Sequence, residues 1–105
     1  MKKKKASKKS KQKPFVIVRA HTAGVHAGFL ESRDETTVVL SKSIRLWRWC
    51  GGSLSEVAAH GPAKGDNKFG AELEELTIVS PQGLEIAKCS EAAMKAIQAV
   101  PEWKA

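Results

Sequence analysis

Hydrophobic and polar residues alternate through much of the segment from residue 15 to residue 49, which is the period typical of β-strands. In residues 15–21 the alternation predicts two faces, one with Val16, Val18 and Ala20 and the other with Phe15, Ile17, Arg19 and His21. The same period predicts strands over residues 25–32, 36–40 and 43–49. Because the connections between these segments are short, we expect antiparallel neighbours.

The pattern changes at Gly51-Gly52. Ser53 and Glu56 have the spacing of a capping box and predict a short helix that ends at Gly61-Pro62. Residues 63–70 read as a polar, glycine-containing loop, and strands are expected over residues 72–80 and 84–89. A last helix is expected from Ser90-Glu91 up to Pro101. The sequence therefore predicts an α+β fold: a mainly antiparallel twisted β-sheet of about six strands, one short inserted helix and a C-terminal helix.

Charge divides the chain into two parts. The formal net charge is +7, but eight of the 18 basic residues are lysines within residues 1–13. The remainder has ten basic and 11 acidic residues and is close to neutral, which excludes a wholly basic, histone-like protein. We expect residues 1–13 to form a disordered lysine-rich tail, because such a run cannot bury enough apolar surface to order itself. Residues 14–105 are expected to form a single ligand-binding domain.

Several classes of protein are disfavoured by what the sequence contains. The longest aliphatic runs are interrupted by charges, so no membrane span is expected, and the basic start is not followed by the apolar region of a signal peptide. The chain therefore reads as intracellular. Cys50 and Cys89 have no CxxC spacing and are expected to be reduced. The three histidines have no metal-binding spacing, so neither a metal nor a cofactor is expected.

The most informative segment is residues 43–49, with the sequence SIRLWRW. In a strand, Arg45, Trp47 and Trp49 would share one face. Indole rings stack on nucleobases, and arginine forms charge-assisted bonds to phosphate, so this face suits a nucleotide. The alternative is that both tryptophans belong to the core or to an interface, with arginine lying across them.

Two further pairs are candidate ligand contacts. Arg19 and His21 interrupt an aliphatic face, although a polar pair at a strand end often marks only where the strand leaves the core. Lys68 and Phe69 join a cation to a ring, although Phe69 could equally fill the edge of the core. No nucleophile, catalytic base or phosphate-binding glycine fingerprint stands out.

Blocks in the same order along residues 15–104 resemble a family of small phage-encoded proteins. The blocks are RAHTAGVHAG (19–28), IRLWRWCGGSLS (44–55), NKF (67–69), EIAKCSEAA (85–93) and IQAVPEWK (97–104). They are similar to the first type of Thoeris anti-defence proteins, and the tryptophan block followed by SLS and the terminal VPxW are the most specific parts. His21, Ile44, Arg48 and Gly70 differ from the residues that the family pattern has there.

This resemblance implies a non-enzymatic sponge in the cytoplasm of the infected bacterial host. Such proteins sequester cyclic nucleotide immune signals, namely glycocyclic ADP-ribose isomers and, in some members, cyclic oligonucleotides. They form homodimers and, in some members, hexamers, with pockets between the sheet of one protomer and the C-terminal helix of its neighbour. Carried onto this chain, the resemblance implies Arg19, Arg45 and Phe69 as ligand contacts, with Trp47 and Trp49 shaping the surroundings.

Two other function classes remain open on sequence grounds. A single-stranded nucleic-acid binder would use the lysine-rich tail together with the tryptophan–arginine strand, whereas in a sponge the tail would bind nucleic acid only weakly. A phage structural or assembly component would use its tryptophans only at interfaces and would bind no small ligand.

Overall fold

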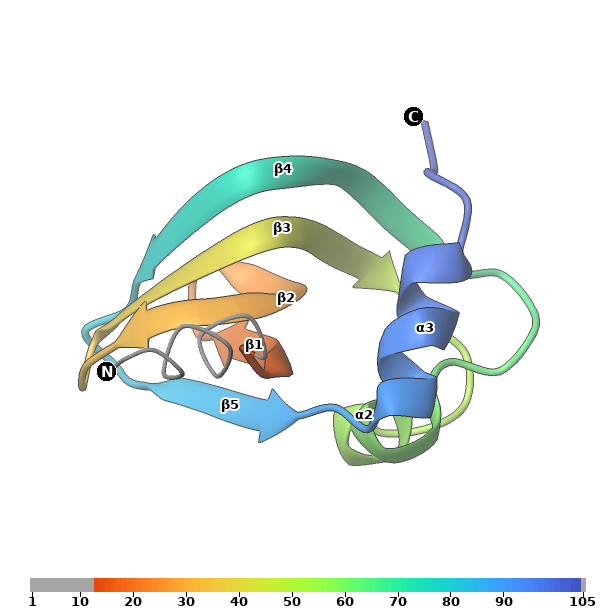
Figure 1. Ribbon diagram of the computed structural model, residues 1–105, viewed down its shortest axis with the longest axis horizontal. Helices are drawn as coiled ribbons and strands as arrows, with labels where there is room; N and C mark the ends of the chain where they lie inside the picture. Colours follow the sequence, from red (N-terminus) through yellow and green to blue (C-terminus); the bar gives the residue numbers. More distant parts are fainter. Residues whose placement is uncertain (1–12, 105) are drawn as a thin grey trace, which may run out of the picture.

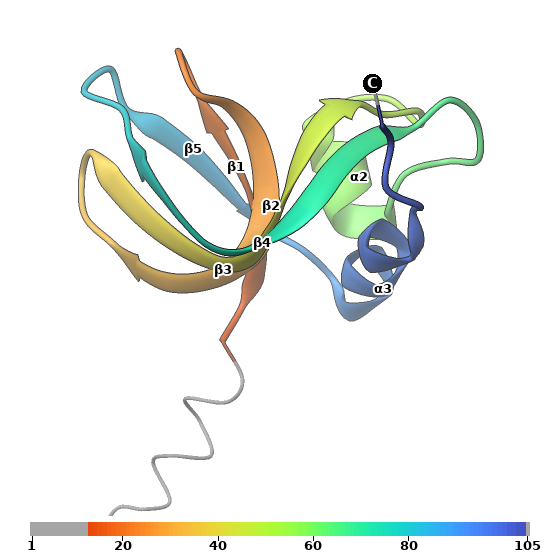
Figure 2. The same ribbon diagram turned by 90° about the horizontal axis from the view of Figure 1, so that it is seen from above.

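The computed structural model describes residues 13–104 (Figures 1 and 2). In this part of the chain, one antiparallel sheet has the strand order β4-β3-β2-β1-β5. Its strands are β1 (Phe15–Ala20), β2 (Gly24–Arg33), β3 (Thr37–Arg48), β4 (Lys68–Val79) and β5 (Leu84–Lys88). Helix α2 (Leu54–His60) lies between β3 and β4, and α3 (Glu91–Ala99) follows β5. The predicted mainly antiparallel α+β fold is confirmed.

The sheet of residues 13–104 has five strands rather than the six expected, because residues 36–40 and 43–49 belong to one strand, β3. Ala27 pairs with Ile44 and Phe29 with Ser41, so β3 contains one more residue than β2 over this stretch. Lys42 takes a φ of 50° there. The polar break in the sequence is therefore a β-bulge, which bends the strand without ending it.

Both faces of the sheet carry a core. On the helix side, Phe15 and Ile17 pack with Leu46, Phe69 and residues of both helices. On the other face, β1 packs against β3 and β4 through a second cluster consisting of Val16, Val18, Ala20, Val38, Leu40 and Ile78. Strands β1 and β4 are not neighbours in the sheet, so their contact requires the strong curvature seen in Figure 2. The alternation predicted for residues 15–20 is thus confirmed.

The two helices begin where the sequence predicts. The Ser53 hydroxyl accepts the Glu56 N–H at 3.4 Å, and the Ser90 hydroxyl accepts the Ala93 N–H at 3.0 Å. Each side chain satisfies one of the free backbone donors of a helix start. Ser90 also donates to the Ala59 carbonyl at 2.8 Å and so ties the start of α3 to α2. Both helices lie at one end of the sheet (Figure 1).

The prediction of a disordered tail falls on residues that lie outside the described range, apart from Lys13. The Lys13 ammonium forms an ion pair with Glu31 of β2. No helix within residues 13–104 combines the length and the apolar character needed to cross a membrane.

Candidate functional site

Arg45 and Trp47 lie on the face of β3 opposite the helices. Their neighbours Ile44 and Leu46 are buried in the helix-side core, as the alternation predicts. Trp47 is 55% exposed, and the Arg45 guanidinium carbon lies 4.2 Å from the centroid of its ring. A cation–π contact of this kind contributes about 0.5–1 kcal/mol at an exposed site. The indole therefore presents a large apolar surface next to a positive charge.

Trp103, from the C-terminal segment, completes the arrangement. Its backbone N–H donates to the Phe69 carbonyl at 2.8 Å, which places the segment beside the start of β4. Its ring meets Trp47 edge to face, with the centroids 6.4 Å apart, and the Lys68 ammonium lies 5.3 Å from the ring centroid of Trp103. Arg45, Trp47, Lys68 and Trp103 are referred to below as the indole–cation cluster.

Two glycines leave room for this cluster. A Cβ on Gly70 would lie 3.4 Å from Trp47 Nε1, so the bare backbone of β4 lets the indole lie close against the strand. A Cβ on Gly24 would lie 2.8 Å from Arg45 Nη2. The guanidinium is therefore held between the Trp47 ring and the turn that leads into β2.

Two cations beside the start of β4 share one carboxylate. Asp66 lies 3.5 Å from Arg48 Nε and 3.9 Å from Lys68 Nζ, so one carboxylate is shared by two cations. Within residues 13–104, no carboxylate forms an ion pair with Arg45. Its guanidinium therefore has donors available for an anionic group.

His26 stands directly opposite Arg45 on β2 and is only 6% exposed. Burial lowers the pKa of His26, and the Arg45 charge lowers it further, against the opposing effect of a 2.8 Å contact between Nε2 and the Ala23 carbonyl. That contact requires Nε2 to carry the proton of the neutral ring. His26 is therefore a neutral cross-strand neighbour of Arg45 and adds no second positive charge beside it.

Trp49 does not share the face of Trp47, so the prediction that Arg45, Trp47 and Trp49 line one face is wrong for its last member. The register shifts between Leu46 and Arg48, and β3 ends at Arg48. Trp49 therefore leaves the alternation, packs against the helix-side core and donates from Nε1 to the Gly52 carbonyl at 3.0 Å.

Phe69 is 1% exposed and is part of the helix-side core, so its ring is not available to a ligand in this arrangement. Its partner across the ladder is Leu46, a core residue, which fixes the inward direction of the ring. Of the predicted Lys68–Phe69 pair, only Lys68 reaches the cluster. The residue that supplies the second ring is Trp103.

Arg19 lies on the opposite face of the sheet from Arg45. Arg19 pairs with Val25, and Arg45 pairs with His26, which is the next residue along β2. Successive residues of a strand point to opposite faces, so the two guanidinium groups diverge. Arg19 instead forms an exposed ion pair with Glu85 at 2.5 Å. His21 lies exposed in the turn after β1, outside the strand predicted to contain it.

The sequence-based choice of site residues missed Trp103 and His26. The signal for Trp103 was available, since it is one of only three tryptophans and follows the Pro101 that ends the helix. His26 gave no signal by itself, because its role depends on the cross-strand register with Arg45. Among residues 13–104, no three His, Cys, Asp or Glu side chains lie close enough together to hold a metal ion.

Comparison with known proteins places most of the chain in one family. Residues 13–97 match the family described as Domain of unknown function (DUF6948). The chain belongs to this family. The match includes the whole sheet and most of α3, whereas Trp103 lies beyond its end. Comparisons with curated proteins and with solved structures found no match. The DUF6948 description assigns no activity.

Proposed function

We propose that the protein is a non-enzymatic sponge that sequesters cyclic nucleotide immune signals and thereby blocks bacterial anti-phage defence. Its ligands would be glycocyclic ADP-ribose isomers or cyclic oligonucleotides, bound in the cytoplasm of the infected host. The observation that carries the proposal is the indole–cation cluster, in which two exposed tryptophans stand beside an arginine that pairs with no carboxylate of residues 13–104. The resemblance to Thoeris anti-defence proteins supports the same function.

The cluster matches the chemistry of a cyclic nucleotide. A base stacked on an indole gains about 1–3 kcal/mol, and a guanidinium can form two parallel hydrogen bonds to one phosphate. Trp47 and Trp103 now meet at 64° with their centroids 6.4 Å apart. A base stacked between the two indoles needs rings that are close to parallel, so Trp103 would have to turn.

The side chains of the cluster favour binding over turnover. Indole, guanidinium and ammonium groups are donors and carry no free lone pair to accept a proton near neutral pH. The neighbouring His26 is buried, with Nε2 engaged by the Ala23 carbonyl. A ligand held by these groups would be released unchanged.

The proposal includes a homodimer. Trp47 is 55% exposed on an open face, whereas ligand sites usually enclose most of the surface of a small molecule. A second copy of the chain that faces the cluster across a two-fold axis would supply the missing wall. Size-exclusion chromatography with light scattering, with and without ligand, measures this directly.

The test is a thermal-shift screen of the full-length protein against cyclic ADP-ribose isomers and cyclic di- and trinucleotides. We expect at least one ligand to raise the melting temperature of the wild type, and Arg45→Gln to lose that increase. Arg33→Gln is the matched control, because this substitution removes the same charge from an exposed position at the far end of β2. Recovery of intact ligand after denaturation separates a sponge from an enzyme. A screen without any shift contradicts the proposal and favours a structural component.

A single-stranded nucleic-acid binder is the second candidate, since exposed indoles beside cations also bind single strands. The seven lysines that precede Lys13 discriminate between the two functions. Replacing them with glutamine in the full-length chain should reduce nucleic-acid affinity and its salt dependence and leave a cyclic-nucleotide shift intact. If the same variant loses the cyclic-nucleotide shift, the cluster is not the site of binding.

A further inference from the structure

Strand β4 lies at one edge of the sheet, and most of its outer side has no partner among residues 13–104 (Figure 1). Near the start of the strand, the Phe69 carbonyl accepts the Trp103 N–H, so the C-terminal segment covers that end. From Leu73 to Val79, no backbone hydrogen bond from residues 13–104 reaches the outer side. A row of unpaired donors and acceptors along a strand is a template for another strand.

The hydrogen-bond pattern shows which residues of β4 point to the open side. The Ser80 N–H donates to the Thr36 carbonyl at 2.7 Å, so Ser80 faces β3. The register with β3 has no shift along residues 72–79. Since alternate residues of an antiparallel strand bond to the same neighbour, the odd-numbered residues of this stretch direct their N–H and C=O groups outward. These residues are Leu73, Glu75, Thr77 and Val79.

The side chains of this stretch restrict what can pair with it. Leu73 is 47% exposed and Val79 is 57% exposed, so two large apolar side chains remain in contact with solvent. Glu72, Glu74 and Glu75 are also exposed and form no ion pair with a cation of residues 13–104. A matching strand must therefore place apolar groups opposite Leu73 and Val79 and no carboxylate opposite a glutamate.

A second copy of β4 meets both requirements in one antiparallel register. With a two-fold axis between the two copies of Leu76, Leu73 lies opposite Val79 of the second copy, and this apolar pair occurs twice. Glu75 then lies opposite Thr77, and no two glutamates are directly opposite each other. Each outward-pointing residue also faces another outward-pointing residue, which is the arrangement in which the two exchange N–H···O=C bonds.

The neighbouring registers are less favourable. A two-fold axis at Glu74 or Glu75 would place two carboxylates directly opposite each other, which is destabilising. An axis at Thr77 would place Pro81, which has no N–H, opposite Leu73 and so would shorten the ladder. The pattern of residues 73–79 therefore selects the register centred on Leu76.

We propose that the outer edge of β4 pairs with the same edge of a second copy of this chain, antiparallel about a two-fold axis at Leu76. The two sheets then form one continuous sheet. Leu76, which is half-buried beside the core cluster that contains Leu40 and Ile78, packs against its own copy. The indole–cation cluster lies beyond the end of this ladder, at the start of β4. This interface is therefore distinct from the one that would enclose a ligand, and each can fail without the other.

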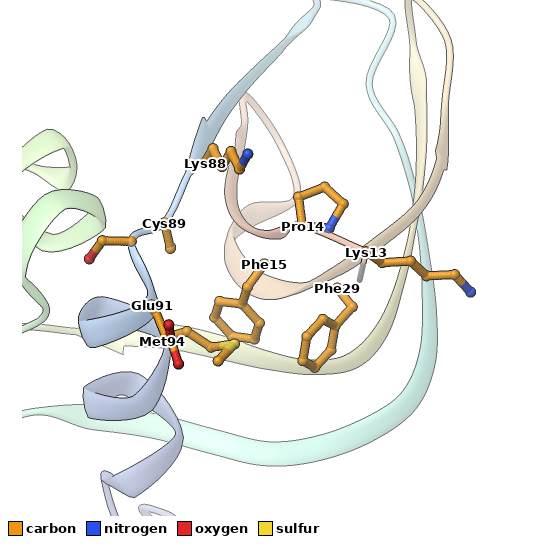
Figure 3. Close-up of a pocket in the computed structure, with 9 residues that line it drawn as sticks. Lys13, Pro14, Phe15, Phe29, Lys88, Cys89, Glu91 and Met94 are labelled. Atoms are coloured by element: carbon orange, nitrogen blue, oxygen red, sulfur yellow. The ribbon is translucent and has the colours of Figure 1, made fainter. Parts of the chain in front are cut away.

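A competing surface for a second copy is a cavity of about 500 Å³ between the start of β1 and the start of α3 (Figure 3). Its lining includes the apolar side chains of Phe15, Phe29 and Met94 and the exposed Glu91, and none of its lining residues belongs to β4. Association through the cavity would leave the β4 edge open. Substitutions at β4 and at Glu91 therefore distinguish the two surfaces.

Sedimentation equilibrium of the full-length protein without ligand measures the dissociation constant of the dimer. Thr77→Lys places an ammonium opposite Glu75 of the second copy, whereas Thr77→Glu places a carboxylate there. We expect Thr77→Lys to dimerise at least about tenfold more tightly than Thr77→Glu, and the difference to shrink at about 1 M salt. Adding Glu75→Lys to Thr77→Glu should restore the dimer. Glu91→Gln is the matched control, because it changes the net charge as Thr77→Lys does but at the cavity, and it should leave the constant unchanged.

Cross-linking locates the two-fold axis. In a non-hydrogen-bonded pair the Cα atoms of the two Leu76 copies would lie about 4.5 Å apart, which a disulfide can span. Leu76→Cys should therefore give a cross-linked dimer on a non-reducing gel after mild oxidation. Glu74→Cys is the matched control, because its two copies would lie about 13 Å apart along the ladder. Wild type reports the background from Cys50 and Cys89.

Three results would overturn the proposal. The first is a wild type that sediments as a monomer at millimolar concentration. The second is equal dimerisation of Thr77→Lys and Thr77→Glu. The third is cross-linking of Leu76→Cys that is no faster than that of Glu74→Cys.

Discussion

Replacing Phe69 with alanine should destabilise the fold strongly, whereas replacing Trp47 with alanine should hardly affect it. Phe69 is 1% exposed and packs in the helix-side core, and Trp47 is 55% exposed. Truncation of a buried phenylalanine costs about 3–5 kcal/mol, which is a large part of the roughly 5–15 kcal/mol that holds a typical domain together. The Trp47 substitution removes one cation–π contact and one edge contact, each worth about 1 kcal/mol or less at an exposed position.

Guanidinium denaturation followed by circular dichroism at 222 nm measures both effects without depending on tryptophan fluorescence. The denaturation midpoint of Phe69→Ala should fall while the denaturant slope stays unchanged. The free energy of unfolding should decrease by at least about 2 kcal/mol more for Phe69→Ala than for Trp47→Ala. Phe69→Leu is the matched control, because it keeps most of the volume and should cost less than about 1.5 kcal/mol. If Phe69→Ala stays within about 1 kcal/mol of wild type yet loses ligand binding, the ring belongs to the binding site and the assignment to the core is wrong.

Two further predictions concern the surroundings of the cluster and the end of α2. Burial and Arg45 lower the pKa of His26, so between that lowered pKa and about 6.5 the unfolded chain binds more protons than the folded chain. The free energy of unfolding should therefore rise with pH across this window. His26→Asn should remove the contribution of His26 to this pH dependence. An unchanged slope in urea titrations at several pH values would argue against a buried neutral ring. Gly61→Ala should reduce the free energy of unfolding clearly more than Gly83→Ala. Both glycines have a positive φ, but a Cβ at Gly61 would lie 2.7 Å from the Ala96 Cβ, whereas no atom lies within 4 Å of a Cβ at Gly83. Equal costs by chemical denaturation would refute the steric argument.

Local signals in the sequence were sufficient for most of the fold. The alternation in residues 15–20 gave the two faces of β1, and Ser53 and Ser90 marked both helix starts. The predicted strand count was too high because the polar residues around Lys42 interrupt the hydrophobic pattern and resemble a strand end. In the structure Lys42 lies within a bulge, at a positive φ. Such a bulge is stabilised by the neighbouring strand and has no signature of its own.

The candidate site was harder to predict because it depends on register. Arg45 and Trp47 were found from alternation alone, but the shift after Leu46 sends Trp49 to the other face. The one-residue offset along β2 likewise separates Arg19 from Arg45. Phe69 was predicted as a ligand contact, but its ladder partner Leu46 directs the ring into the core. The ring that lies beside Trp47 comes from Trp103, to which the sequence analysis assigned no role.

Calorimetric titration of wild-type and Trp47→Ala protein with the cyclic nucleotide that gives the largest thermal shift tests the central claim most directly. A stoichiometric sponge should bind in the nanomolar range, about −12 kcal/mol. Loss of one stacked base should then weaken binding by roughly 1–3 kcal/mol, or about five- to 150-fold, in a variant that remains folded. Equal affinities for the two proteins would contradict a site built on the exposed indole pair.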